Sequence, residues 1–233
     1  MSRSWSIVDF LLIWLAQQIG SAGGFAIAAG TGVGSIFLFS LVGQQIAGLG
    51  LLFWLARRKA DGDLGFTIEG GDFGYIGLGL VLNLGVVTLL LPLSNLLFPE
   101  GRPGQSVATS LMEAESLPVQ IALVVVYVVI GPVAEELVYR GVVLRALEAY
   151  GRRTAIVGSA VIFAAIHLPG LETDQVVRSA AVFLPPFILL GVFLAWLTLR
   201  KGRLGPAIFV HSGWNLLAAL VLLIPTDMLN QVS

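Results

Sequence analysis

The chain has 233 residues, of which 57% are hydrophobic and only 12% are charged, and its mean hydropathy is +0.92. Soluble domains carry about 25% charged residues, so this composition predicts an integral membrane protein. A net charge of -1 supplies no basic field, and no nucleic-acid partner is expected. Because the chain has no cysteine, disulfides, thiol nucleophiles and thiolate ligands are excluded, and any chemistry must use oxygen and imidazole groups.

The first apolar stretch allows two interpretations. Arg3, the apolar run and the small residues that follow are typical of a signal peptide. However, Asp9 interrupts the run and the hydrophobic pattern continues after it. We therefore expect a retained spanning helix.

Seven stretches approach the length of about 20 apolar residues that a transmembrane helix needs. They lie near residues 6–29, 33–56, 74–98, 119–148, 154–168, 181–199 and 204–224. The predicted fold class is an all-α polytopic transmembrane bundle, with residues 1–233 as a single membrane domain. The fifth stretch is short, so we expect it to be tilted or partly submerged among the others. Residues 99–118 are predicted to form a polar loop.

Basic residues near span ends remain on the cytoplasmic side of a membrane. In a seven-span arrangement most of them fall on one side, and only Arg102 and Arg178 fall on the other. The first group comprises Arg3, Arg57, Arg58, Lys59, Arg152, Arg153, Arg200, Lys201 and Arg203. This asymmetry predicts a multi-pass protein with a cytoplasmic N-terminus and a C-terminus outside.

Ionisable residues within spans are rare, since an Asp, Lys or Arg at a helix centre costs about 2.5 to 3.5 kcal/mol, and they are usually functional. Here the polar residues gather in three sequences on three predicted helices: "EELVYR", "FAAIH" and "HSGWN". Both histidines of the chain lie in these segments. The candidate site residues are Glu135, Glu136, Arg140, His167, His211 and Asn215.

The two adjacent glutamates can have different roles. Glu136 and Arg140 are four residues apart and share a helix face, while Glu135 lies about 100° around the helix. One carboxylate can thus be an ionised anchor while the other acts as a base. Spacing alone does not decide which is which. A simpler interpretation is a structural ion pair with interhelical hydrogen bonds from the histidines.

Distances along the helices predict where the three motifs meet. At 1.5 Å per residue, Glu135 and His167 lie roughly 20 to 25 Å from the turn at Arg152, and His211 lies roughly 12 Å from the turn at Arg203. A common site therefore requires the hairpin of the fourth and fifth spans to protrude at its basic end. We expect a cavity that opens to the cytoplasm.

These motifs, in this order on successive hydrophobic helices, resemble those of the CPBP family, also called the ABI or type II CAAX prenyl endopeptidase family. The family motifs are Glu-Glu-x-x-x-Arg, Phe-x-x-x-His and His-x-x-x-Asn, and residues 119–220 form the matching peptidase core. Tyr139 stands where the family often has Phe, and no clear eighth span is present. The resemblance implies an intramembrane endopeptidase whose site contains the six candidate residues.

Two mechanisms are compatible with this resemblance. Glu135, His167 and His211 could ligate zinc, which usually takes three protein ligands and a water at catalytic sites. The His-Glu-x-x-His pair of helical zinc proteases is absent, which favours a metal-free route. In that route Glu135 and His167 activate water, His211 and Asn215 stabilise the oxyanion, and Arg140 holds Glu136 and a substrate carboxylate.

The expected reaction is hydrolysis of a peptide bond near the cytoplasmic membrane face. Expected partners are membrane lipids and a peptide or membrane-protein substrate, which could be lipid-modified. The alternative is a non-catalytic membrane protein, either a transporter or an immunity or partner-binding protein, that uses the polar cluster as an ion or proton site.

Overall fold

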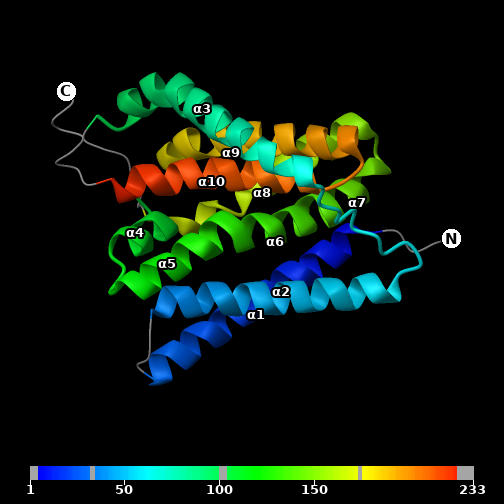
Figure 1. Ribbon diagram of the computed structural model, residues 1–233, viewed down its shortest axis with the longest axis horizontal. Coiled ribbons are helices and arrows are strands. Elements are labelled where there is room, and N and C mark those ends of the chain that lie inside the picture. Colours follow the sequence, from blue (N-terminus) through cyan, green and yellow to red (C-terminus); the bar gives the residue numbers. More distant parts are fainter. Residues whose placement is uncertain (1–4, 32–34, 100–103, 173–174, 225–233) are drawn as a thin grey trace.

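The computed structural model is a helical bundle, and it describes residues 5–31, 35–99, 104–172 and 175–224 (Figure 1). Among these residues, seven helical segments are long and apolar enough to cross a membrane, so the predicted fold class is confirmed. The segments are Ile7–Thr31, Ile36–Arg58, Gly70–Leu97, Leu117–Glu148, Arg152–Gly170, Val176–Lys201 and Gly205–Leu223.

Four of these segments are single helices and three are composite. The single helices are α1 (Ile7–Thr31), α2 (Ile36–Arg58), α9 (Val176–Lys201) and α10 (Gly205–Leu223). The third joins η1 (Gly70–Gly74) to α3 (Tyr75–Leu97), and the fifth joins α8 (Arg152–Ala165) to η4 (Leu168–Gly170). The fourth runs through α5 (Leu117–Val125), η2 (Val126–Ile130), α6 (Gly131–Val138), η3 (Tyr139–Val143) and α7 (Leu144–Glu148).

The segment predicted as a polar loop contains a helix. Residues 106–112 form α4 (Ser106–Met112), preceded by the two-residue strand β1 (Gly104–Gln105). β1 pairs antiparallel with β2 (Leu171–Glu172), with Gln105 opposite Leu171. The prediction missed α4 because two helical turns bury a single residue, Leu111, and so give little hydrophobic periodicity.

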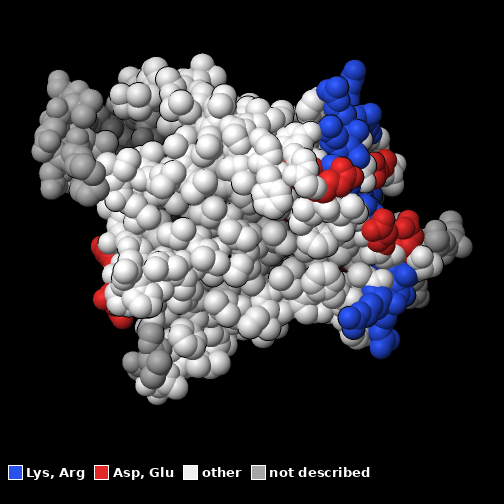
Figure 2. All heavy atoms as spheres, in the orientation of Figure 1, with Lys and Arg blue, Asp and Glu red and all other residues white. Residues whose placement is uncertain are grey.

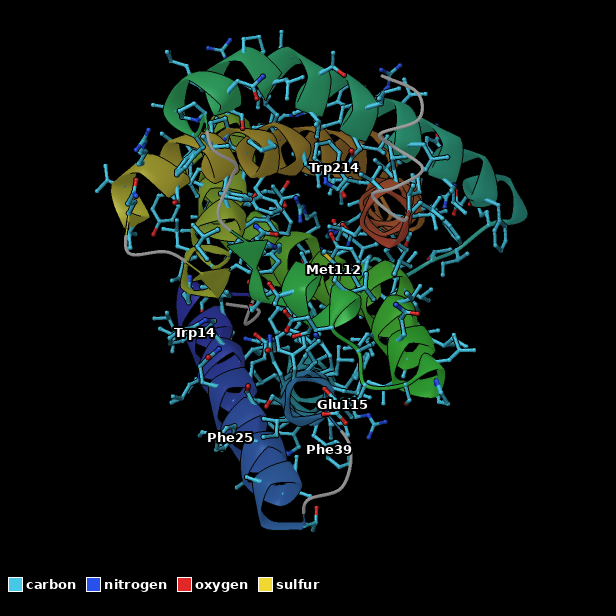
Figure 3. All side chains as sticks on the ribbon, turned by 90° about the vertical axis from the view of Figure 1, so that its left-hand side faces the viewer. Trp14, Phe25, Phe39, Met112, Glu115 and Trp214 are labelled. Carbon is cyan, nitrogen blue, oxygen red and sulfur yellow. The ribbon has the colours of Figure 1, made fainter. Side chains whose placement is uncertain are left out.

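The helices form a central group with one layer on each side. α5 to α10 make up the group, α3 covers α10, and the α1–α2 hairpin lies on the opposite side (Figures 1 and 3). The hairpin meets the group mainly through α1 with η3 and α2 with α5 and α6. The largest core cluster joins both sides to the central helices, since it contains Ile13 and Leu52 of the hairpin, and Leu82 and Val86 of α3 pack against it.

Glycines permit the closest helix approaches. A Cβ on Gly24 of α1 would lie 2.1 Å from the carbonyl oxygen of Phe39 of α2, and one on Gly20 would lie 2.2 Å from that of Gly43. α3 approaches α10 similarly, because a Cβ on Gly213 would lie 2.1 Å from the carbonyl oxygen of Ile76. Small residues let membrane helices pack backbone to backbone, where lipid provides no hydrophobic driving force.

Basic residues gather at one end of the bundle. Three features lie together there: the end of α2, the α7–α8 turn and the α9–α10 turn. In the view of Figure 2, the blue atoms of Lys and Arg are seen at this end and at no other place. We call it the basic end, and its described residues are Arg57, Arg58, Lys59, Arg145, Arg152, Arg153, Arg200, Lys201 and Arg203. Arg178 begins α9 at the other end, and Arg3 and Arg102 lie outside the described residues.

Ion pairs tie the connections together at the basic end. Lys59 lies 2.9 Å from the Asp9 carboxylate, which closes the α1–α2 hairpin. Arg203 donates to Asp72 and to Glu69, at 2.8 Å for Glu69, and so joins the α9–α10 turn to the start of the third span. The hydrogen bond to Asp72 raises the pKa of Arg203 above its ordinary value, so this contact is maintained at every physiological pH.

Replacing Gly24 with Ala should separate α1 from α2. The added methyl group would strike a backbone oxygen that cannot move aside, and overpacking of this kind costs about 1–3 kcal/mol. We expect a lower thermal midpoint in detergent for Gly24→Ala. The control is Gly23→Ala, because a Cβ on the neighbouring Gly23 meets nothing within 4 Å. Equal midpoints for the two variants would contradict the close approach.

Candidate active site

The fourth span is interrupted by two π-helical turns, and the first of them leaves a backbone carbonyl free to accept a hydrogen bond from another helix. In η2 the Gly131 N–H donates to the carbonyl of Val126, five residues back. The Tyr127 carbonyl would then need the N–H of residue 132, which is a proline and has none. Asn215 of α10 donates its Nδ2 hydrogen to this free carbonyl at 2.8 Å. The π-turn thus fixes the orientation of a predicted site residue.

Glu136 is the anchored carboxylate of the pair. Its Oε1 accepts a hydrogen bond from Arg140 Nη1 at 2.9 Å and lies 2.9 Å from His211 Nδ1. Neither Glu136 nor Arg140 is exposed to solvent. The expected i,i+4 ion pair is therefore present, and it also holds an imidazole from another helix.

Arg140 makes its contacts inside the bundle, although its Nε has no hydrogen-bond partner among the described residues. Besides Glu136, it donates from Nη2 to the Gly191 carbonyl of α9 at 3.1 Å, and its guanidinium lies 4.6 Å from the ring centre of Phe163. A planar guanidinium suits several directed contacts of this kind at once. The expectation that Arg140 also grips a substrate carboxylate is wrong, because the side chain is completely buried and does not line the cavity.

Glu135 is the free carboxylate of the pair. Its side chain is 26% exposed, and its Oε2 lies 3.8 Å from His211 Nε2, beyond hydrogen-bonding distance. Among the described residues, Oε2 has no hydrogen-bond partner. Burial therefore distinguishes the two carboxylates: Glu136 is held in the ion pair, and Glu135 has an unpaired oxygen at the cavity.

Both histidines are oriented through Nδ1. His167 follows α8, and its Nδ1 lies 2.8 Å from the Phe163 carbonyl, which can only accept a hydrogen bond. Nδ1 therefore carries the hydrogen, and in the neutral ring Nε2 is the basic nitrogen. The Phe187 ring stacks on His167 with a centroid distance of 4.2 Å. His211 is held in the same way, with Nδ1 directed at Glu136.

Phe163 lies at the centre of these groups. It is completely buried, and its ring meets His167 and His211 edge-on, with centroids 5.0 and 5.6 Å apart. Tyr139 and Phe187 pack around the same ring. Phe163 is therefore a core residue that holds both imidazoles by packing.

A cavity of about 260 Å³ contains the chemical groups. Four of the six predicted residues line it, while Glu136 and Arg140 lie behind its wall. The lining from the site itself is Glu135, His167, His211 and Asn215. The rest includes Phe37, Leu41, Gln44 and Gln45 of α2, Gln105, Ser106, Val107 and Leu111 of the β1–α4 segment, and Phe187 of α9. Trp214 of α10 is buried in the core and does not line the cavity.

The predicted direction of the cavity is wrong. The lining residues of α2 precede its centre, whereas Arg57 and Arg58 end that helix, and β1 and α4 lie at the end opposite the basic residues. None of the basic-end residues lines the cavity. The depth estimate placed Glu135 and His167 at one level, and it brought His211 to them only if the hairpin of the fourth and fifth spans protrudes. It gave no indication of whether side chains fill the space toward the basic end or toward the opposite end.

The described residues do not form a preorganised metal site. No three His, Asp or Glu side chains among them are close enough together to hold an ion. Glu135 and His211 approach each other at 3.8 Å, but His167 does not complete a ligand set with them. The described residues thus offer no ready set of the three protein ligands that a catalytic zinc usually takes.

The chain is thus a polytopic helical membrane protein with a carboxylate, imidazole and amide site. Residues 117–217 match the family model described as "Type II CAAX prenyl endopeptidase Rce1-like", which confirms the resemblance seen in the three motifs. The matched segment contains all six predicted site residues and excludes the first three spans. Comparison with curated proteins and with solved structures gave no match.

Sequence reasoning missed three contributors to the site. The Tyr127 carbonyl orients Asn215, and the Gly-Pro pair at residues 131 and 132 was a sequence signal for the helix irregularity that frees it. Phe187 supports His167 from α9, and no motif marked it. Gln45 of α2 lines the cavity, and no motif marked it.

Arg140→Met should destabilise the fold severely. It removes one partner of a fully buried ion pair, which typically costs about 3–5 kcal/mol because the remaining charge stays desolvated. We expect a large drop in the thermal midpoint in detergent. Arg153→Met at the exposed basic end is the control and should leave the midpoint nearly unchanged. Similar midpoints for the two variants would mean that the pair contributes little.

Proposed function

We propose that the protein is an intramembrane endopeptidase in which Glu135 and His167 activate a water molecule. The observation that carries the proposal is the unpaired Glu135 carboxylate in a cavity beside the Nε2 of His211, with its neighbour Glu136 locked in an ion pair. The family match supports peptide hydrolysis as the reaction class.

In the proposed reaction Glu135 takes a proton from water while the water oxygen bonds to the peptide carbonyl carbon. The neutral His167 ring offers Nε2 as an acceptor that holds the same water. When the tetrahedral intermediate collapses, the C–N bond breaks and the proton passes from Glu135 to the departing amine. Atoms and charge balance without a further reactant.

We assign oxyanion stabilisation to α10. Asn215 uses one amide hydrogen for the Tyr127 carbonyl and keeps a second for the substrate oxygen. His211 can donate from Nε2 only when both of its ring nitrogens carry hydrogens, because the Nδ1 hydrogen is directed at Glu136. A single donor of this kind is worth about 2.7 to 4 kcal/mol in an enclosed site.

We propose a peptide or membrane-protein segment as the substrate. The apolar part of the cavity wall, which includes Leu41, Leu111 and Leu123, supports binding of apolar side chains next to the carboxylate. The name of the matched family refers to prenylated substrates, and a lipid-modified tail is one form that the substrate could take.

We further propose that the basic end faces the cytoplasm. Eight of its nine described residues lie at or beyond the ends of spans, and Arg145 is the one inside a span. Basic residues in such positions remain on the cytoplasmic side of a membrane. This orientation gives a cytoplasmic N-terminus and a C-terminus outside. Residues 1–233 then form one membrane domain with the peptidase core at 119–220.

Glu135→Gln tests the proposed base. The amide keeps the shape of the side chain but cannot take a proton from water, so cleavage of a membrane reporter should fall by about 10²- to 10⁴-fold. Glu148→Gln, on the exposed end of the same span, is the matched control and should remain active. The thermal midpoints of both variants should stay near that of the parent.

Full cleavage by Glu135→Gln would overturn the assignment of Glu135 as the base, and a purified parent protein that does not cleave the reporter would favour a non-catalytic membrane protein. Metal content of the purified active enzyme tests the second part of the proposal. Stoichiometric zinc whose removal by a chelator abolishes cleavage would replace the metal-free route and leave the site residues unchanged.

A further inference from the structure

The two ends of the bundle differ in charge and in packing. On the fourth span, every residue from Glu136 to Leu144, toward the basic end, is buried. On α10, Gly205 to Val210 are buried apart from the partly exposed Phe209. Phe163 and Leu194 fill the space from α8 and α9, and neither is exposed. The described residues thus close the site on its basic side.

On the opposite side of the site the described residues leave space. The cavity extends from Glu135 toward β1 and α4, where it is lined by Gln105, Ser106 and Leu111. Figure 3 views the bundle from this end and shows α4, with Met112 labelled, over the middle of the bundle. The charged residues of the adjoining segment are acidic, Glu113 and Glu115, in contrast to the arginines and lysines of the basic end.

We propose that substrate enters the cavity from the non-cytoplasmic side of the membrane. This inference rests on the proposed peptidase function and on the basic end being cytoplasmic. The substrate class is then a peptide segment presented on the outer side, such as the outward-facing half of a membrane anchor or an exported peptide. A lipid-modified tail confined to the cytoplasm would meet the packed side of the site.

Cysteine labelling tests this directly, because the chain has no cysteine of its own. Ser106→Cys places one thiol in the cavity lining, Glu115→Cys places one in the exposed segment after α4, and Arg153→Cys marks the basic end. A membrane-impermeant maleimide is applied to intact cells and to permeabilised cells. We expect labelling at positions 106 and 115 in intact cells, and at position 153 only after permeabilisation.

The reverse pattern, with position 153 labelled in intact cells and position 115 protected, would overturn the proposal. Labelling at position 115 but not at position 106, in intact and permeabilised cells alike, would also overturn it, because the cavity would then be closed on that side. Labelling does not measure cleavage, so a failure here is distinguishable from a failure of the peptidase proposal.

A separate observation concerns Gln45 of α2. Its side chain is only 8% exposed, its Oε1 has no hydrogen-bond partner among the described residues, and it lines the same cavity as Glu135 and His167. It lies outside the segment that matches the family model. A buried acceptor without a partner is unfavourable, so such a group calls for one from outside the fold.

We infer that Gln45 accepts a hydrogen bond from a backbone N–H of the bound substrate. An extended peptide next to Glu135 exposes its own N–H groups, and in a water-poor cavity each of them needs an acceptor. The carboxamide oxygen of Gln45 supplies one without the cost of a charge. α2 would thereby contribute to substrate binding while the family-matched helices perform the chemistry.

Gln45→Met keeps the length of the side chain and removes the acceptor. We expect the KM for a membrane reporter to rise by about tenfold, as for loss of one hydrogen bond, with kcat within about twofold of the parent. Gln18→Met is the matched control, because Gln18 is exposed on α1 away from the cavity. An unchanged KM would overturn the assignment, as would an equal fall in kcat and thermal midpoint, which would indicate a packing role.

Discussion

The buried ion pair of Glu136 and Arg140 is the interaction on which the site depends. Two charges without solvent exposure are tolerated in a membrane protein only when each finds directed partners. Arg140 finds the Gly191 carbonyl and the Phe163 ring, and Glu136 finds His211. These partners come from α8, α9 and α10, so satisfying one pair of charges fixes the relative positions of the four helices that form the site.

Unsatisfied backbone contributes to the same assembly. The π-turn at residues 126–130 and Pro132 leave the Tyr127 carbonyl without a partner inside its own helix. In a membrane such a group must be paired, and Asn215 supplies the hydrogen. The interruption of the helix therefore orients an amide next to the reactive carboxylate, which agrees with the frequent occurrence of π-bulges at functional sites.

Much of this could be predicted from the sequence, because apolar length and helical spacing are local properties. Seven spans and the Glu136–Arg140 pair follow from them. The side of the site on which the cavity lies could not be predicted in this way, because it depends on which residues of different helices fill the same space. The role of Arg140 was partly wrong for the same reason: its spacing from Glu136 is local, but its contact with Gly191 joins residues 51 positions apart.

The division of labour between the two glutamates follows from helix geometry and packing together. Adjacent residues of a helix point about 100° apart. When one carboxylate points into the packed interior, its neighbour therefore points to the edge of the packed region. Here that edge is the cavity wall, where Glu135 lies beside the Nε2 of His211. Moving the pair by one residue toward the basic end would place both charges in the core, because Leu137 is buried as Glu136 is. The packed basic side of the site and the cavity on the opposite side are thus consequences of the same placement, because the groups that anchor Glu136 also fill the space behind it.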